Sequence, residues 1–364
     1  MIKIIKILLI TVLSFVLLFV FIVVRLFAVK IVDSQLQIKH LKNLQDMYAS
    51  ESFEALDETT FVDFNLADSS IKLNEIQMIA SHNSYKKRGT ALGKLFIGLG
   101  SDFRESNALK YGYKDFTAQF EAGIRSMEID LRMRKTSFML THVPLVDNSS
   151  VAPDFAMALD EIKLFSDHNP NHVPIIILME IKDDWMILDH ALQVIGPDQL
   201  TLLNQLLIDK LGDILFMPNE MLEADKTLLE TVQSTGWPSV QSLLGKVIFV
   251  LHPGNFTSPY YELDESLESQ AMFLAVYKTG IAEDYASFVV HNEIDVESIS
   301  DLVDQGFMVR TRIDDYLIYE QDNYDNAIMS GAQILSSDFT IGRSDLSSND
   351  VIYLPDQKTV VRKV

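Results

Sequence analysis

The chain has 364 residues, of which 30 are Lys or Arg and 51 are Asp or Glu, so its formal net charge is −21 at pH 7. This acidity argues against nucleic-acid binding, because a nucleic acid binds Lys and Arg in exchange for its counterions. The sequence contains no cysteine. Disulfides and thiolate metal sites are therefore excluded, and a bound metal must use carboxylate, carbonyl, amide or imidazole ligands.

The N-terminal segment is strongly apolar. From Ile7 to Val24 it has no charged residue, and only Thr11 and Ser14 are polar. A helix of this length extends roughly 27 Å, which nearly spans the hydrocarbon core of a bilayer. No small-x-small cleavage site follows, which favours an uncleaved anchor over a secretory signal. We predict a single transmembrane helix at residues 1–29, with the rest of the chain on the extracytoplasmic side, although basic residues flank both ends of the span.

Three further regions follow the anchor. Residues 30–70 are polar and acidic, with apolar residues at helical spacing, and predict a juxtamembrane helical spacer. Residues 71–345 alternate short apolar runs with amphipathic stretches and predict the main folded domain, and residues 346–364 predict a C-terminal tail. We predict eight strands: Ile76–Ser81, Arg125–Leu131, Pro174–Ile181, Asp213–Phe216, Lys246–Leu251, Ser287–His291, Phe307–Arg312 and Ala332–Ser336.

Helical periodicity appears between these runs, at residues 155–165, 203–211 and 296–303. Eightfold alternation of strand and helix predicts an α/β fold, a (β/α)8 TIM barrel, with an open doubly wound sheet as the alternative. No Gly-rich phosphate loop of the nucleotide-binding kind is present. Residues 85–113 form a Gly-containing insertion after the first strand, where we expect a mobile loop beside the barrel mouth.

Polar residues gather where the first three predicted strands end, which is where barrels of this type carry catalytic groups. Their i, i+2 spacing places Glu128 and Asp130 on one face of the second strand. Buried carboxylates are costly unless paired or metal-bound, and a set of oxygen ligands suits Ca²⁺ or Mg²⁺. Two histidines nearby could act as general acid and transition-state donor. The candidates are His82, Asn83, Glu128, Asp130, His142, Glu180 and Lys182.

Each of these features also has a purely structural interpretation. The His-Asn pair could form a capped turn. The Glu-x-Asp pair could belong to a salt-bridge ladder with Arg125 or Arg132. Lys182 could pair with the aspartates that follow it. Arg310 and Arg312 share one face of the seventh strand, and could bind phosphate or balance nearby carboxylates. The prediction therefore depends on the whole set meeting at the ends of successive strands.

The order of these residues resembles the catalytic region of phosphoinositide-specific phospholipase C, and more closely the bacterial calcium-dependent family. The similarity extends in order over residues 71–340, through the segments QMIASHNSY (77–85), FEAGIRSMEIDLR (120–132), VPIIILMEIKD (173–183), LLGKVIFVL (243–251), GFMVRTRID (306–314) and SGAQILSSDF (330–339).

The resemblance implies a role for each candidate. Asn83, Glu128, Asp130 and Glu180 would bind Ca²⁺, and Glu128 would also accept the proton of the inositol 2-hydroxyl. His82 would stabilise transition-state charge, and His142 would protonate the departing glycerol oxygen. Lys182 would contact the substrate phosphate, for which Arg312 is a further candidate.

These features predict a membrane-anchored, Ca²⁺-dependent phosphodiesterase, with Mg²⁺ as the other possible metal. It would cleave the glycerol-phosphate bond of phosphatidylinositol-type lipids and release a cyclic inositol phosphate and diacylglycerol. The expected partners are a phospholipid substrate and the membrane itself. Two alternatives remain: a glycerophosphodiester phosphodiesterase or sphingomyelinase-D-like enzyme, and a non-catalytic protein that binds a lipid head group.

Overall fold

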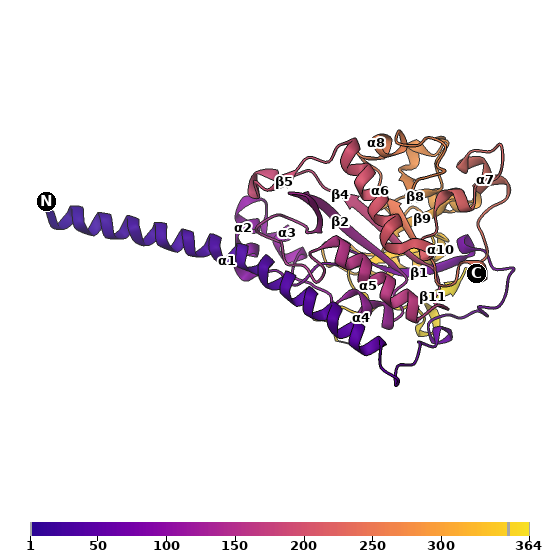
Figure 1. Ribbon diagram of the computed structural model, residues 1–364, viewed down its shortest axis with the longest axis horizontal. Coiled ribbons are helices and arrows are strands. Elements are labelled where there is room, and N and C mark those ends of the chain that lie inside the picture. Colours follow the sequence, from indigo (N-terminus) through magenta and orange to yellow (C-terminus); the bar gives the residue numbers. More distant parts are fainter. Residues whose placement is uncertain (1, 348–349, 364) are drawn as a thin grey trace.

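A computed structural model describes residues 2–347 and 350–363. Within these residues, eight parallel strands form a closed barrel, because the last of them pairs with the first (Figure 1). This confirms the predicted α/β barrel. The barrel strands are β1 (Ile76–Ser81), β2 (Ser126–Arg134), β4 (Ile175–Ile181), β6 (Val247–Leu251), β7 (Met272–Val276), β8 (Phe288–Val290), β9 (Met308–Arg312) and β10 (Ile334–Ser337).

Seven of the eight predicted strands coincide with barrel strands, but the fourth, Asp213–Phe216, is wrong. This segment begins in the 3-10 turn Gly212–Ile214, and only Leu215 makes a bridge, to Val247. The strand missing from the prediction is β7. It is a short, continuous apolar run buried on both faces, and such a run has no alternating pattern that would identify it as a strand.

Shorter strands extend the barrel at both ends. β3 (Ser137–Leu140) forms a hairpin with β2, and β5 (Leu192–Gln193) pairs with β2 beside it. At the other end, β11 (Val360–Arg362) pairs antiparallel with β1. Residues near the C-terminus, expected as a tail, therefore contribute a strand to the sheet.

The three predicted helices are present as α5 (Phe155–His168), α6 (Pro197–Leu211) and α9 (Val296–Asp304). Aspartates cap two of them: Asp154 accepts the Met157 backbone N–H and Asp295 accepts that of Ser298. The remaining helices and 3-10 turns are α4 (Phe116–Glu121), α7 (Leu228–Ser234), α8 (Thr257–Tyr261), α10 (Gln321–Met329), η1 (Glu58–Thr60), η2 (Leu73–Glu75), η3 (Met186–Leu188), η4 (Gly212–Ile214), η5 (Pro218–Glu220), η6 (Gln241–Leu243), η7 (Lys278–Gly280) and η8 (Pro355–Gln357).

The insertion after β1 is not the loop that we expected, because it folds into two helices, α2 (Ala91–Gly100) and α3 (Phe103–Ala108). Thr90 caps the first by accepting the Gly93 backbone N–H at 3.1 Å, and Asp102 caps the second by accepting that of Glu105 at 2.8 Å. The glycines of this segment suggested flexibility, whereas its caps and apolar residues stabilise a helical pair.

The N-terminus forms one continuous helix, α1 (Ile2–Tyr48). Among the described residues it is the one helix long and apolar enough to cross a membrane, and its apolar window is unburied. The first half projects from the barrel and the second half lies along it (Figure 1). The side chain of Gln37 exchanges two 2.9 Å hydrogen bonds with the Asp154 backbone, and His40 lies 3.1 Å from Glu161 of α5. The helical part of the predicted spacer is therefore packed on the barrel.

Candidate active site

The structure brings all eight predicted side chains to the wall of one cavity of about 710 Å³ at the carboxyl ends of the barrel strands. This volume is in the range of small-molecule sites. The residues come from β2, β4 and β9 and from the segments that follow β1, β3 and β4, which is why their clustering depends on barrel closure. They are His82, Asn83, Glu128, Asp130, His142, Glu180, Lys182 and Arg312.

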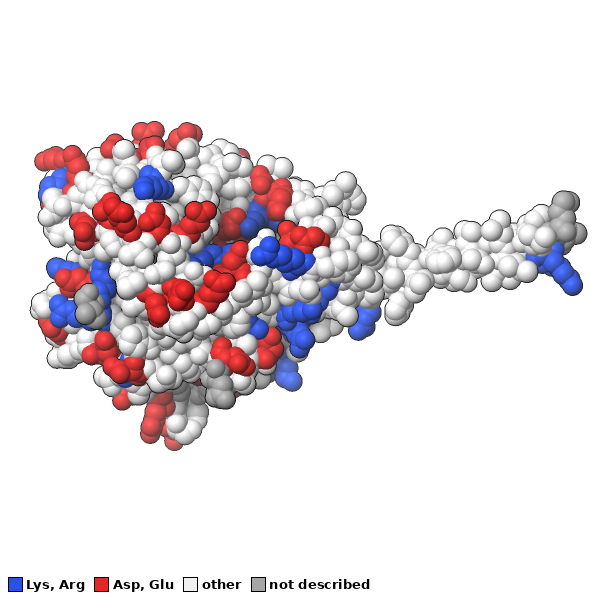
Figure 2. All heavy atoms as spheres, turned by 180° about the vertical axis from the view of Figure 1, so that it is seen from behind, with Lys and Arg blue, Asp and Glu red and all other residues white. Residues whose placement is uncertain are grey.

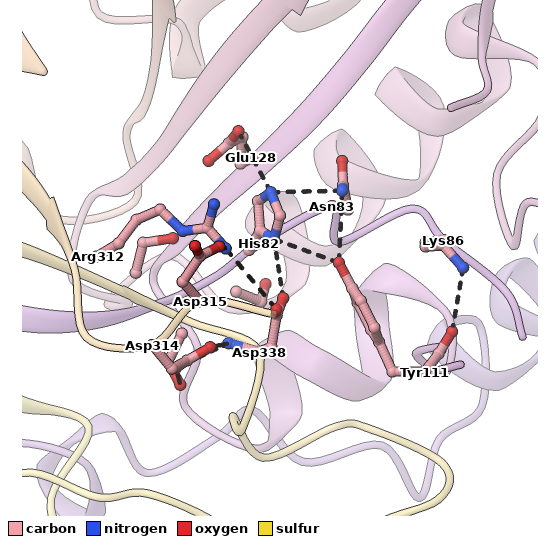
Figure 3. Close-up of polar contacts among 12 residues, drawn as sticks. His82, Asn83, Lys86, Tyr111, Glu128, Arg312, Asp314, Asp315 and Asp338 are labelled. Carbon is pink, nitrogen blue, oxygen red and sulfur yellow. Dashed lines mark hydrogen bonds and ion pairs between the residues drawn. The ribbon is translucent and has the colours of Figure 1, made fainter. Parts of the chain in front are cut away.

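His82 directly follows β1 and is held by the carboxylate of Asp338, which directly follows the last barrel strand (Figure 3). Its Nδ1 lies 2.8 Å from Asp338 Oδ1, which leaves Nε2 directed toward Glu128, 3.9 Å away. Burial lowers the pKa of His82, but Asp338 and Glu128 outweigh it and raise the pKa above its ordinary value. The imidazole is thereby favoured in its protonated form, which can donate to an anionic group.

Asn83 follows in a left-handed backbone conformation, with φ of 50°. Asn tolerates this region better than most residues. Its side chain is buried, with Nδ2 3.4 Å from the Tyr111 hydroxyl, and the Tyr85 hydroxyl lies 3.5 Å from its Oδ1. Both contacts are long, so the amide oxygen remains available as a ligand.

The two carboxylates of β2 have different electrostatic environments. Burial raises the pKa of Glu128, but Arg310, with which it forms an ion pair, and His82 lower it to about 2. Burial also raises the pKa of Asp130, and here the opposing charges of Lys182 and His142 do not compensate. Asp130 accepts a 3.0 Å hydrogen bond from the Tyr85 hydroxyl. Glu128 is therefore an anion at neutral pH, whereas the charged form of Asp130 is disfavoured by burial and would be stabilised by nearby positive charge.

Lys182 supplies part of that positive charge. Its Nζ lies 2.6 Å from Glu180 Oε1 and 4.0 Å from Asp130 Oδ2. Burial lowers its pKa, but these two carboxylates raise it above the ordinary value, so the side chain stays protonated. The alternative pairing of Lys182 with the aspartates that follow it is not observed among its ion pairs.

The arginines divide between structure and site. Arg125 pairs with Glu58 and Arg132 with Asp184, so neither forms the predicted ladder with the Glu-x-Asp pair. Arg310 forms an ion pair with Glu128, which matches the interpretation in which it balances a nearby carboxylate. Arg312 lines the cavity, 3.8 Å from Asp338 and 3.6 Å from Asp315.

His142 is oriented by a buried ion pair that the sequence did not reveal. Its Nδ1 lies 2.9 Å from Asp147 Oδ2, and Lys86 Nζ lies 3.2 Å from Oδ1 of the same carboxylate. Burial raises the pKa of Asp147, but Lys86 and His142 lower it below its ordinary value. Arg132 donates a 2.9 Å hydrogen bond to the His142 carbonyl. Both the ring and the backbone of His142 are therefore fixed, with Nε2 left for a ligand.

Sequence reasoning gave Asp338 no role in the site beyond charge balance, and gave Asp147 and Lys86 none. Asp338 directly follows β10, so applying the strand-end argument to the last strand would have found it. Asp147 lies in a loop and Lys86 at the start of the insertion, and no local pattern relates them. His252 and His291 also follow barrel strands, β6 and β8, but they contact the nearby carbonyls of Pro253 and Glu293 and do not line the cavity.

The donors present fit a hard divalent cation. Asn83, Glu128, Asp130 and Glu180 offer only oxygen ligands around one cavity, and the negative charges of Glu180 and Glu128 add to the effect of burial on the pKa of Asp130. A cation would relieve this repulsion. The ligand oxygens of these three carboxylates do not all lie within 4.8 Å of one another. Among the described residues, the group that meets this distance is His40, Asp115 and Glu161, which lies outside the cavity.

Comparison with known proteins identifies the family. The family model described as phosphoinositide phospholipase C, Ca²⁺-dependent, matches residues 71–134 and 131–363. The chain belongs to this family. It is accordingly a phosphoric diester hydrolase of the phospholipase C kind, as the sequence predicted. The family's description names calcium, and the comparisons give no support for Mg²⁺ as the metal.

Solved structures show the same fold at low sequence identity. The calcium-dependent phosphoinositol-specific phospholipase C from Pseudomonas sp. is 15% identical over 84% of this chain and 99% of that chain, with a TM-score of 0.59. The Ca²⁺-dependent phosphatidylinositol-specific phospholipase C from Streptomyces antibioticus is 17% identical over 74% of this chain and 95% of that chain, with a TM-score of 0.53. A search of curated protein sequences finds no match.

Proposed function

We propose that this chain is a membrane-anchored, Ca²⁺-dependent phospholipase C that cleaves the glycerol-phosphate bond of phosphatidylinositol-type lipids. The observation that carries the proposal is the position of two oriented histidines, His82 and His142, on the wall of the cavity that also holds the oxygen ligands. Each histidine is held through Nδ1 by a buried aspartate. Of two such histidines, one can donate to a phosphate oxygen while the other protonates the leaving group.

The phosphate would lie among positive groups at the barrel mouth. Asn83, Glu128, Asp130 and Glu180 would hold Ca²⁺, which would supply positive charge and lower the pKa of the inositol 2-hydroxyl. His82, whose pKa is raised, would donate from Nε2 to a phosphate oxygen as charge develops there. Lys182 and Arg312 would neutralise the remaining charge of the phosphate.

The bond changes then balance within the site. The inositol 2-hydroxyl oxygen bonds to phosphorus, and the bond from phosphorus to the glycerol oxygen breaks. His142 Nε2 donates a proton to that oxygen, with Asp147 stabilising the imidazolium before transfer. The products are a cyclic inositol phosphate and diacylglycerol. If water then opens the ring, His142, now neutral, acts as the base.

A carboxylate of β2 would accept the proton of the 2-hydroxyl. The resemblance assigned this step to Glu128. Its low pKa makes it a weak acceptor, since proton acceptance is most effective when the pKa lies near the working pH. Asp130, whose pKa is raised by burial, lies in the same cavity and is the other candidate for this step. We therefore propose that Glu128 acts mainly as a cation ligand and only secondarily as the proton acceptor.

We further propose that α1 is the anchor, with residues 1–29 in the bilayer and the barrel on the extracytoplasmic side. The support is the length and apolar character of α1, whose apolar segment is not buried against the barrel. Residues 30–70 connect the anchor to the catalytic domain at 71–345, and the C-terminal residues 346–364 complete the chain.

The test uses the full chain in phosphatidylinositol-containing nanodiscs, with Ca²⁺ and then with a chelator. Release of a cyclic inositol phosphate that stops on chelation is expected. His142→Ala should reduce this release about 10²–10⁴-fold, whereas His190→Ala, at an exposed histidine outside the cavity, should not reduce it. Release of glycerol phosphate or free choline instead, or calcium binding without turnover on any lipid, would contradict the proposal. A near-wild-type rate for His142→Ala would remove the general-acid assignment.

A further inference from the structure

One side of the active-site cavity is apolar and is built from the anchor helix. The cavity that contains the catalytic groups is also lined by α1 and by α2 of the insertion. Their contributions are Phe19, Ile22, Val23, Leu26, Phe96 and Ile97. These two helices contact each other. The phosphate-binding groups and the apolar wall therefore belong to one continuous cavity.

The apolar wall overlaps the predicted membrane span. The uncharged run ends at Val24, and α1 rises about 1.5 Å per residue, so Phe19 lies roughly 8 Å along the helix inside the predicted span. Leu26, just beyond the run, is 2% exposed and marks where the helix meets the barrel. The cavity thus extends from the ends of the barrel strands to the depth where acyl chains begin.

The surface around this entrance has the character of a membrane interface. The α2–α3 segment exposes Leu95, Leu99 and Phe103. Residues 87–114, which contain it, have six Lys or Arg and two Asp or Glu, in a chain whose net charge is −21. Figure 2 shows α1 projecting without charge until its tip, while acidic residues cover much of the visible face of the barrel. Apolar and basic residues are therefore concentrated where α1 leaves the barrel.

From these observations we infer that α1 is a wall of the lipid-binding site as well as an anchor. Phe19, Ile22 and Val23, facing Phe96 and Ile97 of α2, form an acyl-chain site for the glycerol-linked chains of a lipid whose phosphate lies among the catalytic groups. This inference rests on the proposed function. A lipid would enter laterally between α1 and α2 without leaving the bilayer, so the enzyme would act on the membrane in which it is anchored.

The test compares two substrates and two adjacent valines. The substrates are long-chain phosphatidylinositol in nanodiscs and an acyl-free aryl ester of phosphoinositol in solution, both with Ca²⁺. Val23 lines the cavity, whereas Val24 is 60% exposed and does not. Val23→Trp fills the site. It should lower kcat/KM for the lipid at least tenfold more than for the aryl ester, and Val24→Trp should leave the ratio of the two unchanged.

A second pair tests the site by deletion, in case the tryptophan disturbs folding. Phe19 and Phe21 are each 62% exposed, and only Phe19 lines the cavity. Phe19→Ala should raise the KM for the lipid several-fold more than Phe21→Ala does. Equal effects within both pairs would overturn the inference and leave the proposed function intact. Failure of the unmodified enzyme to cleave either substrate would instead overturn the proposed function.

Discussion

Replacing Asp147 by Asn would test whether the buried ion pair behind His142 supports both folding and catalysis. The substitution keeps the shape of the side chain and removes its charge. Lys86 is 0% exposed and Asp147 is 1% exposed, and their charged atoms lie 3.2 Å apart. Breaking a buried pair by removing one partner leaves an uncompensated charge, so we expect Asp147→Asn to lower the free energy of unfolding by about 3–5 kcal/mol.

The same substitution should reduce catalysis for a separate reason. Asp147 accepts from His142 Nδ1 at 2.9 Å and stabilises the imidazolium. An amide can hold the ring in place but cannot stabilise its positive charge, and it can also favour the wrong tautomer. Because general acid catalysis contributes about 10²–10⁴-fold, we expect the rate on phosphatidylinositol to fall within this range. The lipid KM should change little, since Asp147 contacts the histidine and not the cavity.

A double variant separates the two effects. In Lys86→Met with Asp147→Asn, the unpaired buried cation is gone, so part of the lost stability should return while the rate stays low. Asp167→Asn is the control for stability, since its pair with Lys163 is exposed and worth at most about 1 kcal/mol. Urea unfolding in detergent measures stability, and inositol phosphate release measures rate. Near-wild-type stability and rate for Asp147→Asn would refute the reasoning, as would recovery of the rate in the double variant.

Two further predictions concern stability away from the site. Burial lowers the pKa of His172 to about 3, against about 6.5 in the unfolded chain; its stabilising contribution is complete above pH 6.5 and is lost as pH falls, by about 2 kcal/mol at pH 5. Urea unfolding at pH 7.5 and pH 5 should show this loss, and His172→Asn should reduce it; an unchanged pH dependence would contradict the assignment. Arg125→Met should lower the free energy of unfolding by about 3–5 kcal/mol, because Glu58, 4% exposed, would lose its buried partner. Comparable stability of this variant and the wild type would show that Glu58 is neutralised in another way.

Apolar patterns predicted most of the barrel strands, and the candidate site residues were found because they lie at or near the ends of those strands. The spacing of Glu128 and Asp130 and the positions of His82 and Glu180 follow from strand periodicity, and the barrel then brings them together. β7 was missed because a short run buried on both faces lacks alternation. The insertion was misread because its glycines outweighed the capping residues Thr90 and Asp102 in the prediction.

The partners of the catalytic groups required the tertiary structure. Asp338 meets His82 only because β10 pairs with β1, across nearly the whole sequence. The pairing of Arg310 with Glu128 is equally distant. A sequence pattern shows which charges exist but not which of them meet, since ion pairs between strands depend on register. The prediction therefore found side chains that line the cavity and missed most of those that set their charge.

The acidic composition of the chain is consistent with action at a membrane once the position of α1 is considered. A freely diffusing protein of net charge −21 would be repelled by an anionic bilayer. A covalent anchor removes the need for charge attraction, because it fixes the effective concentration of the barrel at the surface. Under this proposal, basic residues are needed only beside the entrance, and residues 87–114 supply them there. The proposed anchoring would account for the uneven charge, because attraction would be needed only at the lipid entrance and the rest of the surface would be free to be acidic.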